Sequence, residues 1–101
     1  MKVVFSAQAR AEILGIGRHV AQDDPDAAER LVRRLIERCL SLDAAPRQGP
    51  VVARLRGHEI HRLVHGSHLI FYTVADAVRI LRVVHGARSP RLLLKDLDPT
   101  A

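Results

Sequence analysis

The residues best suited to chemistry in this chain are basic and lie in its last part. Arg82, His85 and Arg88 follow one another at short spacing, and Arg62 precedes them on a neighbouring apolar segment. Arginine stabilises charge that develops on a phosphate in a transition state, and histidine transfers protons near neutral pH. The four residues could therefore form a nuclease site, or they could bind a partner without any chemistry.

A structural interpretation of the same arginines is also open. The apolar run at residues 78–84 has the composition of a core strand, yet Arg79 and Arg82 interrupt it. An unpaired buried charge is costly. On this interpretation Arg62 and Arg82 pair with carboxylates such as Glu59 or Asp76 and merely hold one face of a sheet.

The histidines suggest a metal site at first sight, because four of the six lie close together: His58, His61, His65 and His68. Alternate side chains of a strand point to opposite faces. His61 and His65 therefore share a face, and the other two join them only if a turn intervenes. No cysteine supports the set, so we predict no metal and expect histidines that are exposed or hydrogen-bonded.

The sequence contains no signature of a hydrolase nucleophile or of a nucleotide-binding site. The serines lack the glycine-rich elbow of a hydrolase nucleophile, and there is no glycine-rich phosphate loop. The single cysteine, Cys39, lies in an apolar helical pattern and is expected to be a buried, inert thiol. We predict no cofactor and no small-molecule substrate.

Composition is that of one globular domain covering residues 1–101, with 48% hydrophobic residues. The formal net charge is +5 and the pI is about 10.6, which favours an acidic partner. We find no signal peptide and no apolar run near the roughly 20 residues of a membrane span, so we expect a cytoplasmic protein.

The first half of the chain is predicted to be a strand and two helices. Residues 2–5 form the strand, and Ser6 caps a helix over residues 7–21. Asp24 and Pro25 then suit the cap and first turn of a second helix, over residues 25–42. The two helices are expected to form an antiparallel hairpin.

The second half is predicted to be a loop and a meander of strands. Residues 43–57 contain two prolines and two glycines and are expected to form a long loop, which is often functional. Strands follow over residues 58–64, 68–74 and 78–85. The predicted fold is therefore α+β, a two-helix hairpin packed on a small, mainly antiparallel four-stranded sheet.

The order strand, helix, helix and three strands, together with three sequence segments, resembles the RelE/ParE superfamily of toxins from type II toxin–antitoxin modules. The segments read AQDDPDAA at 21–28, SHLIFYTV at 67–74 and ILRVVHGAR at 80–88, and the last two are the more specific. The resemblance covers nearly the whole chain.

The resemblance is closer to the ParE branch. RelE-like members cleave messenger RNA on the ribosome, whereas ParE-like members poison DNA gyrase. The catalytic arginine of RelE-like chains corresponds here to His68 or Leu69, and their late tyrosine to one of residues 92–94. Arg88 does match a basic position, so the endoribonuclease stays open as the alternative. Ser89 departs from the aspartate that often follows this motif in ParE-like chains.

Both branches imply an acidic, partly disordered antitoxin, ParD-like here, that forms a hetero-oligomer with the toxin. We predict a toxin that inhibits gyrase by protein contact, with the endoribonuclease or an inactive antitoxin-binding relative as alternatives. The antitoxin is expected to pack on the helices and across the sheet. The predicted partner-binding residues are Arg62, Phe71, Tyr72, Arg82, His85, Arg88, Arg91 and Leu92. A nuclease would use Arg62, Arg82, His85 and Arg88, and the toxic surface would include the tail, residues 90–97.

Overall fold

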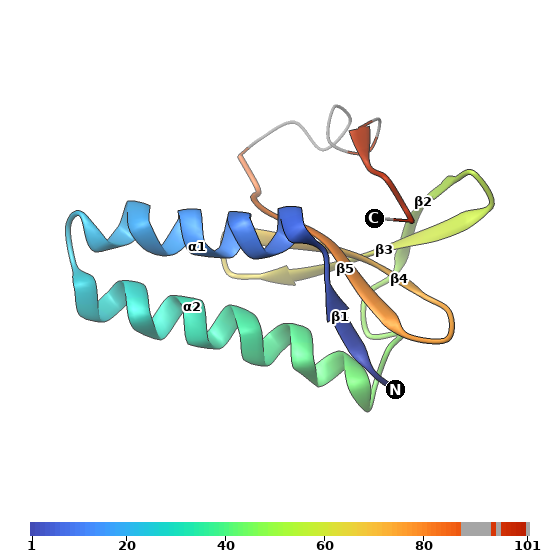
Figure 1. The fold of residues 1–101 in the computed structure, drawn as a ribbon, viewed down its shortest axis with the longest axis horizontal. Helices are drawn as coiled ribbons and strands as arrows, with labels where there is room; N and C mark the ends of the chain where they lie inside the picture. The colour runs from blue at the N-terminus through green and yellow to red at the C-terminus, as the bar shows by residue number, and fades with distance from the viewer. Residues whose placement is uncertain (88–93, 95, 101) are drawn as a thin grey trace.

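The computed structural model describes residues 1–87, 94 and 96–100, in which two helices lie on one face of a five-stranded sheet (Figure 1). The elements, in chain order, are β1 (Val3–Phe5), α1 (Ala7–Ala21), α2 (Pro25–Leu40), a 3-10 turn η1 (Ser41–Asp43), β2 (Val51–Leu55), β3 (His58–His65), β4 (His68–Val74) and β5 (Val78–His85). The strand order is β1-β5-β4-β3-β2, with β1 parallel to β5 and the other neighbours antiparallel. The predicted α+β class and helical hairpin are confirmed.

The strand count predicted from the sequence is wrong, because the sheet has five strands rather than four. The extra strand, β2, lies inside the predicted loop and pairs with β3. A two-residue turn joins them, with φ of 51° at Arg56 and 81° at Gly57. Two successive positive φ angles are typical of a type I′ hairpin turn. Pro50 and Gly49 obscured this strand in the sequence, because both usually interrupt strands.

Both helices begin at the predicted caps. The Ser6 hydroxyl accepts a hydrogen bond from the Ala9 N–H at 3.0 Å, and the Asp24 carboxylate accepts one from the Ala27 N–H at 3.0 Å. The helices pack closely where Gly17 faces Val32, since a Cβ on Gly17 would lie 2.8 Å from the valine methyl. The hairpin extends beyond the sheet, so part of its surface is left without a sheet beneath it (Figure 1).

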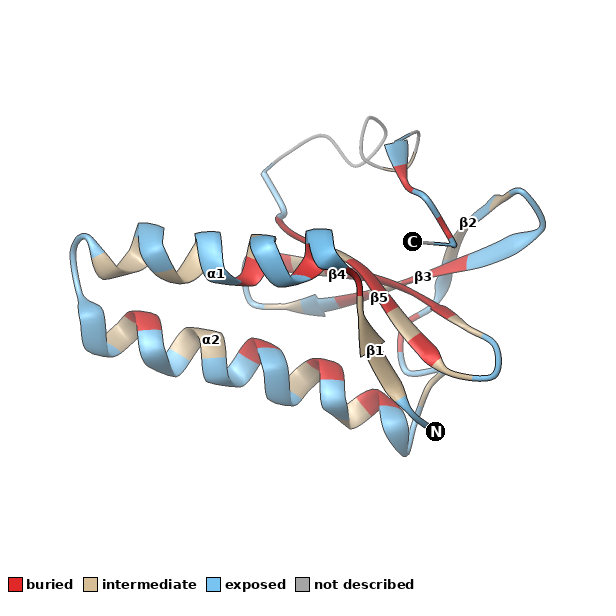
Figure 2. Ribbon diagram, in the orientation of Figure 1, coloured by how far each residue is buried: buried red, intermediate tan, exposed pale blue. Residues whose placement is uncertain are grey.

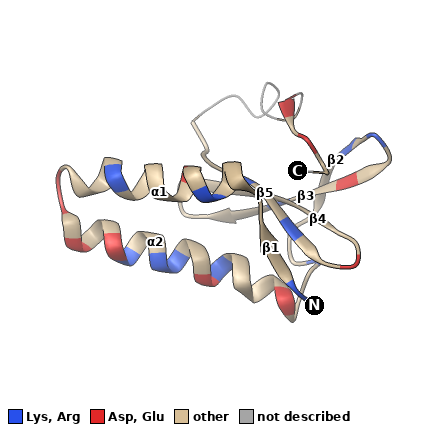
Figure 3. Ribbon diagram, in the orientation of Figure 1, with Lys and Arg blue, Asp and Glu red and all other residues tan. Residues whose placement is uncertain are grey.

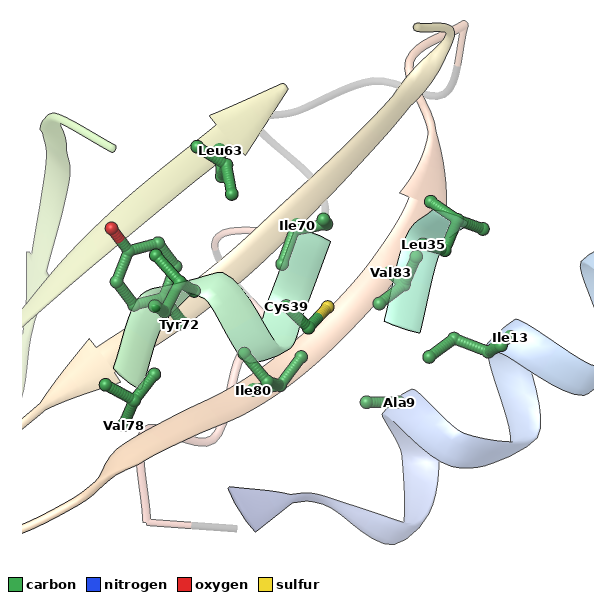
Figure 4. Packing of buried hydrophobic residues seen from close by; sticks show 11 residues of the cluster. Ala9, Ile13, Leu35, Cys39, Leu63, Ile70, Tyr72, Val78, Ile80 and Val83 are labelled. Carbon is green, nitrogen blue, oxygen red and sulfur yellow. The ribbon is translucent and has the colours of Figure 1, made fainter. Parts of the chain in front are cut away.

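Buried apolar residues lie on both faces of the sheet, and Figure 2 shows the buried positions along its strands. The larger core lies between helices and sheet, and Leu35, Cys39, Ile70 and Ile80 are fully buried there (Figure 4). The predicted buried state of Cys39 is confirmed. The second core, on the opposite face, contains these buried residues: Ile60, Phe71, Leu81, Val84 and Leu97. Leu97 and the partly buried Leu94, both C-terminal to the strands, therefore cover part of that face.

The end of the predicted loop is fixed to the sheet. Gly49 donates its N–H to the Tyr72 hydroxyl at 2.9 Å, and its carbonyl accepts from Nδ1 of His61 at 2.7 Å. The rings of His61 and Tyr72 stack with centroids 5.0 Å apart. The next residue, Pro50, accepts a hydrogen bond from the N–H of Arg62 at 3.0 Å. This segment is therefore part of the core framework rather than a free binding loop.

Candidate macromolecular interface

Arg82 lies in an internal ion pair with Glu12 of α1. Its Nε is 2.9 and 3.0 Å from the two carboxylate oxygens, and its Nη2 is 2.8 Å from one of them. The side chains of Arg82 and Glu12 are only 11% and 17% exposed. The predicted carboxylate partner exists, but it is Glu12 rather than Glu59 or Asp76. Glu59 instead pairs with Arg54 at 3.2 Å.

Glu12 also completes the edge of β5. The short strand β1 pairs only with the first part of β5, and Ser6 extends the contact by donating its N–H to the carbonyl of Ile80 and its hydroxyl to that of Leu81. One residue beyond Arg82, the N–H of Val83 donates to the Glu12 carboxylate at 3.1 Å. Helix α1 therefore satisfies backbone groups that a longer β1 would have paired.

Arg62 lies on β3 with its side chain on the face opposite the helices. The register places it beside Phe71 of β4, which in turn lies beside Arg82 of β5. Arg62 is half-buried, and its Nε is a buried nitrogen with no hydrogen-bond partner among the residues that the structure describes. A buried donor without an acceptor is destabilising by about 1–3 kcal/mol.

His85 lies on the other face of the sheet from Arg62. Its register partner is His68, and their rings form an edge-to-face pair with centroids 5.5 Å apart. Because faces alternate along a strand, both histidines share the face of Leu63 and Val83, which pack against the helices. Arg62, Arg82 and His85 therefore do not converge on one point.

The remaining predicted partner-binding residues are in the core or outside the described residues. Phe71 and Tyr72 are fully buried, the first in the core opposite the helices and the second in the core beneath them. Burial raises the pKa of the Tyr72 hydroxyl, against the smaller opposing effect of its bond to Gly49. Arg88, Arg91 and Leu92 lie outside the residues that the structure describes.

The helical hairpin carries an apolar groove that was not predicted from the sequence. This shallow, open groove of about 580 Å³ lies between α1 and α2. It is lined by Leu14, Gly17, Ala28, Val32 and Ile36, together with Arg18, Glu29 and Arg33. Leu14 is 55% exposed and Ile36 is 36% exposed. The signal in the sequence was Leu14, which lies off the apolar stripe of its helix.

Arg18 and Arg33 are among the residues that line this groove, and further basic residues follow along α2 (Figure 3). The pair between Arg33 and Glu29 is exposed, at 2.7 Å, and Arg38 donates to Gln48 at 2.7 Å. Such exposed pairs contribute little to stability, about 0.2–1 kcal/mol. The surface of α2 is therefore free to exchange these contacts for those of a partner.

No described helix is both long enough and apolar enough to cross a membrane. Among the described residues, no three histidine, cysteine or acidic side chains are grouped so that they could hold a metal ion. His61 is committed to the Gly49 carbonyl and to its stacking on Tyr72, which is a structural role.

Comparisons with known proteins agree with this architecture. The family described as the ParE toxin of the type II toxin–antitoxin system parDE matches residues 3–90. Among solved structures, the chromosomal ParDE toxin–antitoxin system from P. aeruginosa superposes with a TM-score of 0.68 at 22% identity, covering 84% of this chain and 95% of that chain. No curated protein matches. The structural likeness concerns the fold, whereas the family match spans most of the sequence; the chain belongs to the ParE family of type II toxins.

Proposed function

We propose that this protein is the toxin of a ParDE-type module, that it inhibits DNA gyrase through protein–protein contact in the cytoplasm, and that an acidic antitoxin neutralises it in a hetero-oligomer. The observation that carries the proposal is the match of the ParE family to residues 3–90. The ParDE system of P. aeruginosa, which has the same fold, supports it.

The apolar groove supports the antitoxin part of the proposal. Its floor is apolar, and exposed leucine and isoleucine side chains lie along it. An amphipathic helix places apolar residues every three to four positions and buries them in such a groove. The net charge of +5 and the arginines beside the groove favour an acidic partner. We therefore place an antitoxin helix in this groove.

The arrangement of basic residues favours gyrase over messenger RNA as the target. A nuclease that used Arg62, Arg82 and His85 would need all three around one scissile phosphate. Here Arg62 and His85 lie on opposite faces of the sheet, and Arg82 is held by Glu12. The toxic surface predicted from the sequence comprised Arg62, Arg82, His85 and Arg88 with the tail, residues 90–97. Because Arg62 and His85 lie on opposite faces and Arg82 is paired with Glu12, we propose that Arg88 and the tail carry this surface.

The target is tested by expressing the chain without its antitoxin. We expect growth arrest with a DNA-damage response, and inhibition of supercoiling by purified gyrase. Cleavage of messenger RNA in a translation reaction with purified ribosomes, without any effect on gyrase, would instead establish the endoribonuclease. Unchanged growth would identify an inactive relative.

Neutralisation is tested with two exposed leucines of similar accessibility. Leu14→Glu changes the groove, whereas Leu40→Glu changes a side chain of α2 that is 46% exposed and does not line it. The assay needs the cognate antitoxin, which is to be sought as a small acidic protein in the adjacent reading frame. Loss of a buried leucine contact is worth about 1.5–3 kcal/mol, so we expect Leu14→Glu to weaken antitoxin binding by about 10- to 100-fold.

In growth assays, Leu14→Glu should remain toxic when the antitoxin is co-expressed, and Leu40→Glu should be rescued like the wild type. Equal rescue of both variants would place the antitoxin somewhere other than this groove.

A further inference from the structure

Three histidines from consecutive strands form a row at one end of the sheet. His65 of β3 is the register partner of His68 of β4, and His68 is the partner of His85 of β5. Directly opposed residues in a sheet share a face and have neighbouring side chains. The turn at Gly66 is what brings His68 onto the same face as His65. We call these three residues the histidine row.

Two members of the histidine row, His68 and His85, line a cleft beside α1. The cleft has a volume of about 770 Å³, and its polar lining from α1 comprises Glu12 and His19. Glu12 does not neutralise the row, because both of its oxygens are engaged by Arg82 and one also by the N–H of Val83. His68, at the centre of the row, is 9% exposed and therefore has little water to stabilise a charge.

His85 links the row to the turn that follows β5. Its Nδ1 accepts a hydrogen bond from the N–H of Ala87 at 3.1 Å. In the same turn, the N–H of Gly86 donates to the carbonyl of Ser67 at 2.7 Å, which joins the end of β5 to the β3–β4 turn. A protonated imidazole carries hydrogen on both nitrogens and cannot accept at Nδ1. The contact with Ala87 therefore exists only with an unprotonated Nδ1 on His85.

We propose that the histidine row is a pH-sensitive switch: acidification charges neighbouring imidazoles, separates the end of β5 from the β3–β4 turn and weakens the fold. The effect has two sources. Like charges directly opposed across strands repel each other. In addition, the buried position of His68 disfavours its charged form. This switch is a property of the chain itself and does not depend on the proposed target or antitoxin.

The direction of the pH dependence follows from His68. Burial first, and then the charges of His85 and His65, lower the pKa of His68 below its ordinary value of 6.5. The unfolded chain consequently binds more protons at His68 than the folded chain does. The contribution of the neutral His68 ring to the free energy of unfolding is fully present above pH 6.5. It is lost as the pH falls toward the lowered pKa of His68. Between pH 6.5 and the lowered pKa, the unfolded chain binds up to one proton more at His68 than the folded chain does. The unfolding equilibrium constant therefore rises by up to about tenfold for each unit by which the pH falls.

The test is urea denaturation of the purified chain from about pH 8 to about pH 5, in the wild type and in two glutamine variants. His68→Gln removes the central member of the row. His58→Gln removes an exposed histidine beside the β2–β3 turn, outside the row. We expect wild type and His58→Gln to lose stability in parallel on acidification, and His68→Gln to lose clearly less. An equal loss in all three proteins would overturn the proposal.

NMR of the wild-type protein provides a second measurement that needs no variant. The His68 ring should titrate below pH 6.5, and amide-exchange protection at Gly86 and Ala87, corrected for intrinsic exchange, should fall as it does so. If His68 titrates at or above 6.5, or if protection in this turn stays constant while the ring titrates, there is no switch here.

Discussion

Glu12 and Arg82 show how one buried ion pair connects the helix layer to the sheet. The carboxylate receives the arginine and also a backbone N–H of β5, so three donors converge on it. A buried pair of this kind is not in itself proof of high stability, because both charges lose their hydration. Removing one partner destabilises the fold, because the other charge is left buried without a charge of opposite sign.

We therefore expect Glu12→Ala to destabilise the protein by about 3–5 kcal/mol in urea denaturation. The matched control is Glu29→Ala, which removes an ion pair whose side chains are 61% and 71% exposed. Its effect should stay within about 0.5 kcal/mol. Similar losses of unfolding free energy in the two variants would mean that the buried Glu12–Arg82 pair contributes no more to stability than the exposed pair.

At the scale of the elements, the two helix N-caps differ in what surrounds them. Asp24 caps α2 at an exposed position, where water can replace its side chain. Ser6 caps α1 in a buried position, and its hydroxyl simultaneously donates to the carbonyl of Leu81 at 2.9 Å. One hydroxyl thus begins the helix and holds it against β5.

Substitution of the two caps by alanine should separate these roles. Asp24→Ala is expected to reduce the free energy of unfolding by about 1 kcal/mol, the usual value of a lost cap. Ser6→Ala should reduce it by about 2–3 kcal/mol, because a buried carbonyl also loses its donor. Denaturation of both variants under the same conditions measures the difference, and equal losses would contradict the second role of Ser6.

At the scale of the whole molecule, both faces of the sheet are covered, one by the helices and the other in part by Leu94 and Leu97. Cys39 lies in the larger core and reports on the opening of the helix layer (Figure 4). Burial raises the pKa of its thiol from 9.0 to about 12. Only the thiolate reacts with common thiol reagents.

We expect the native protein at mildly alkaline pH to react with a thiol reagent at least about a thousandfold more slowly than the urea-unfolded protein. The factor follows from the difference between the pKa of about 12 for the buried thiol and the ordinary value of 9.0. Each pKa unit reduces the thiolate fraction about tenfold. The rate in the native state should rise with urea in step with the unfolded fraction. Rapid labelling without urea would show that α2 opens without global unfolding.

Local features of this protein were determined by the sequence alone. Ser6 and Asp24 marked the helix starts, β-branched residues marked β3, β4 and β5, and the motif at residues 80–88 pointed to the family. These signals act within a few residues, where backbone preferences and capping have their effect.

Only the tertiary structure decided the features that depend on strand register. Strand β2 forms by pairing with the free edge of β3. Arg82 pairs with Glu12, which is 70 positions away in the sequence. The histidine row results from the register of three neighbouring strands. The same register separates Arg62 from His85, although the sequence suggested one site. A shift of one residue in pairing turns every side chain to the other face, so residue spacing alone could not decide which groups meet.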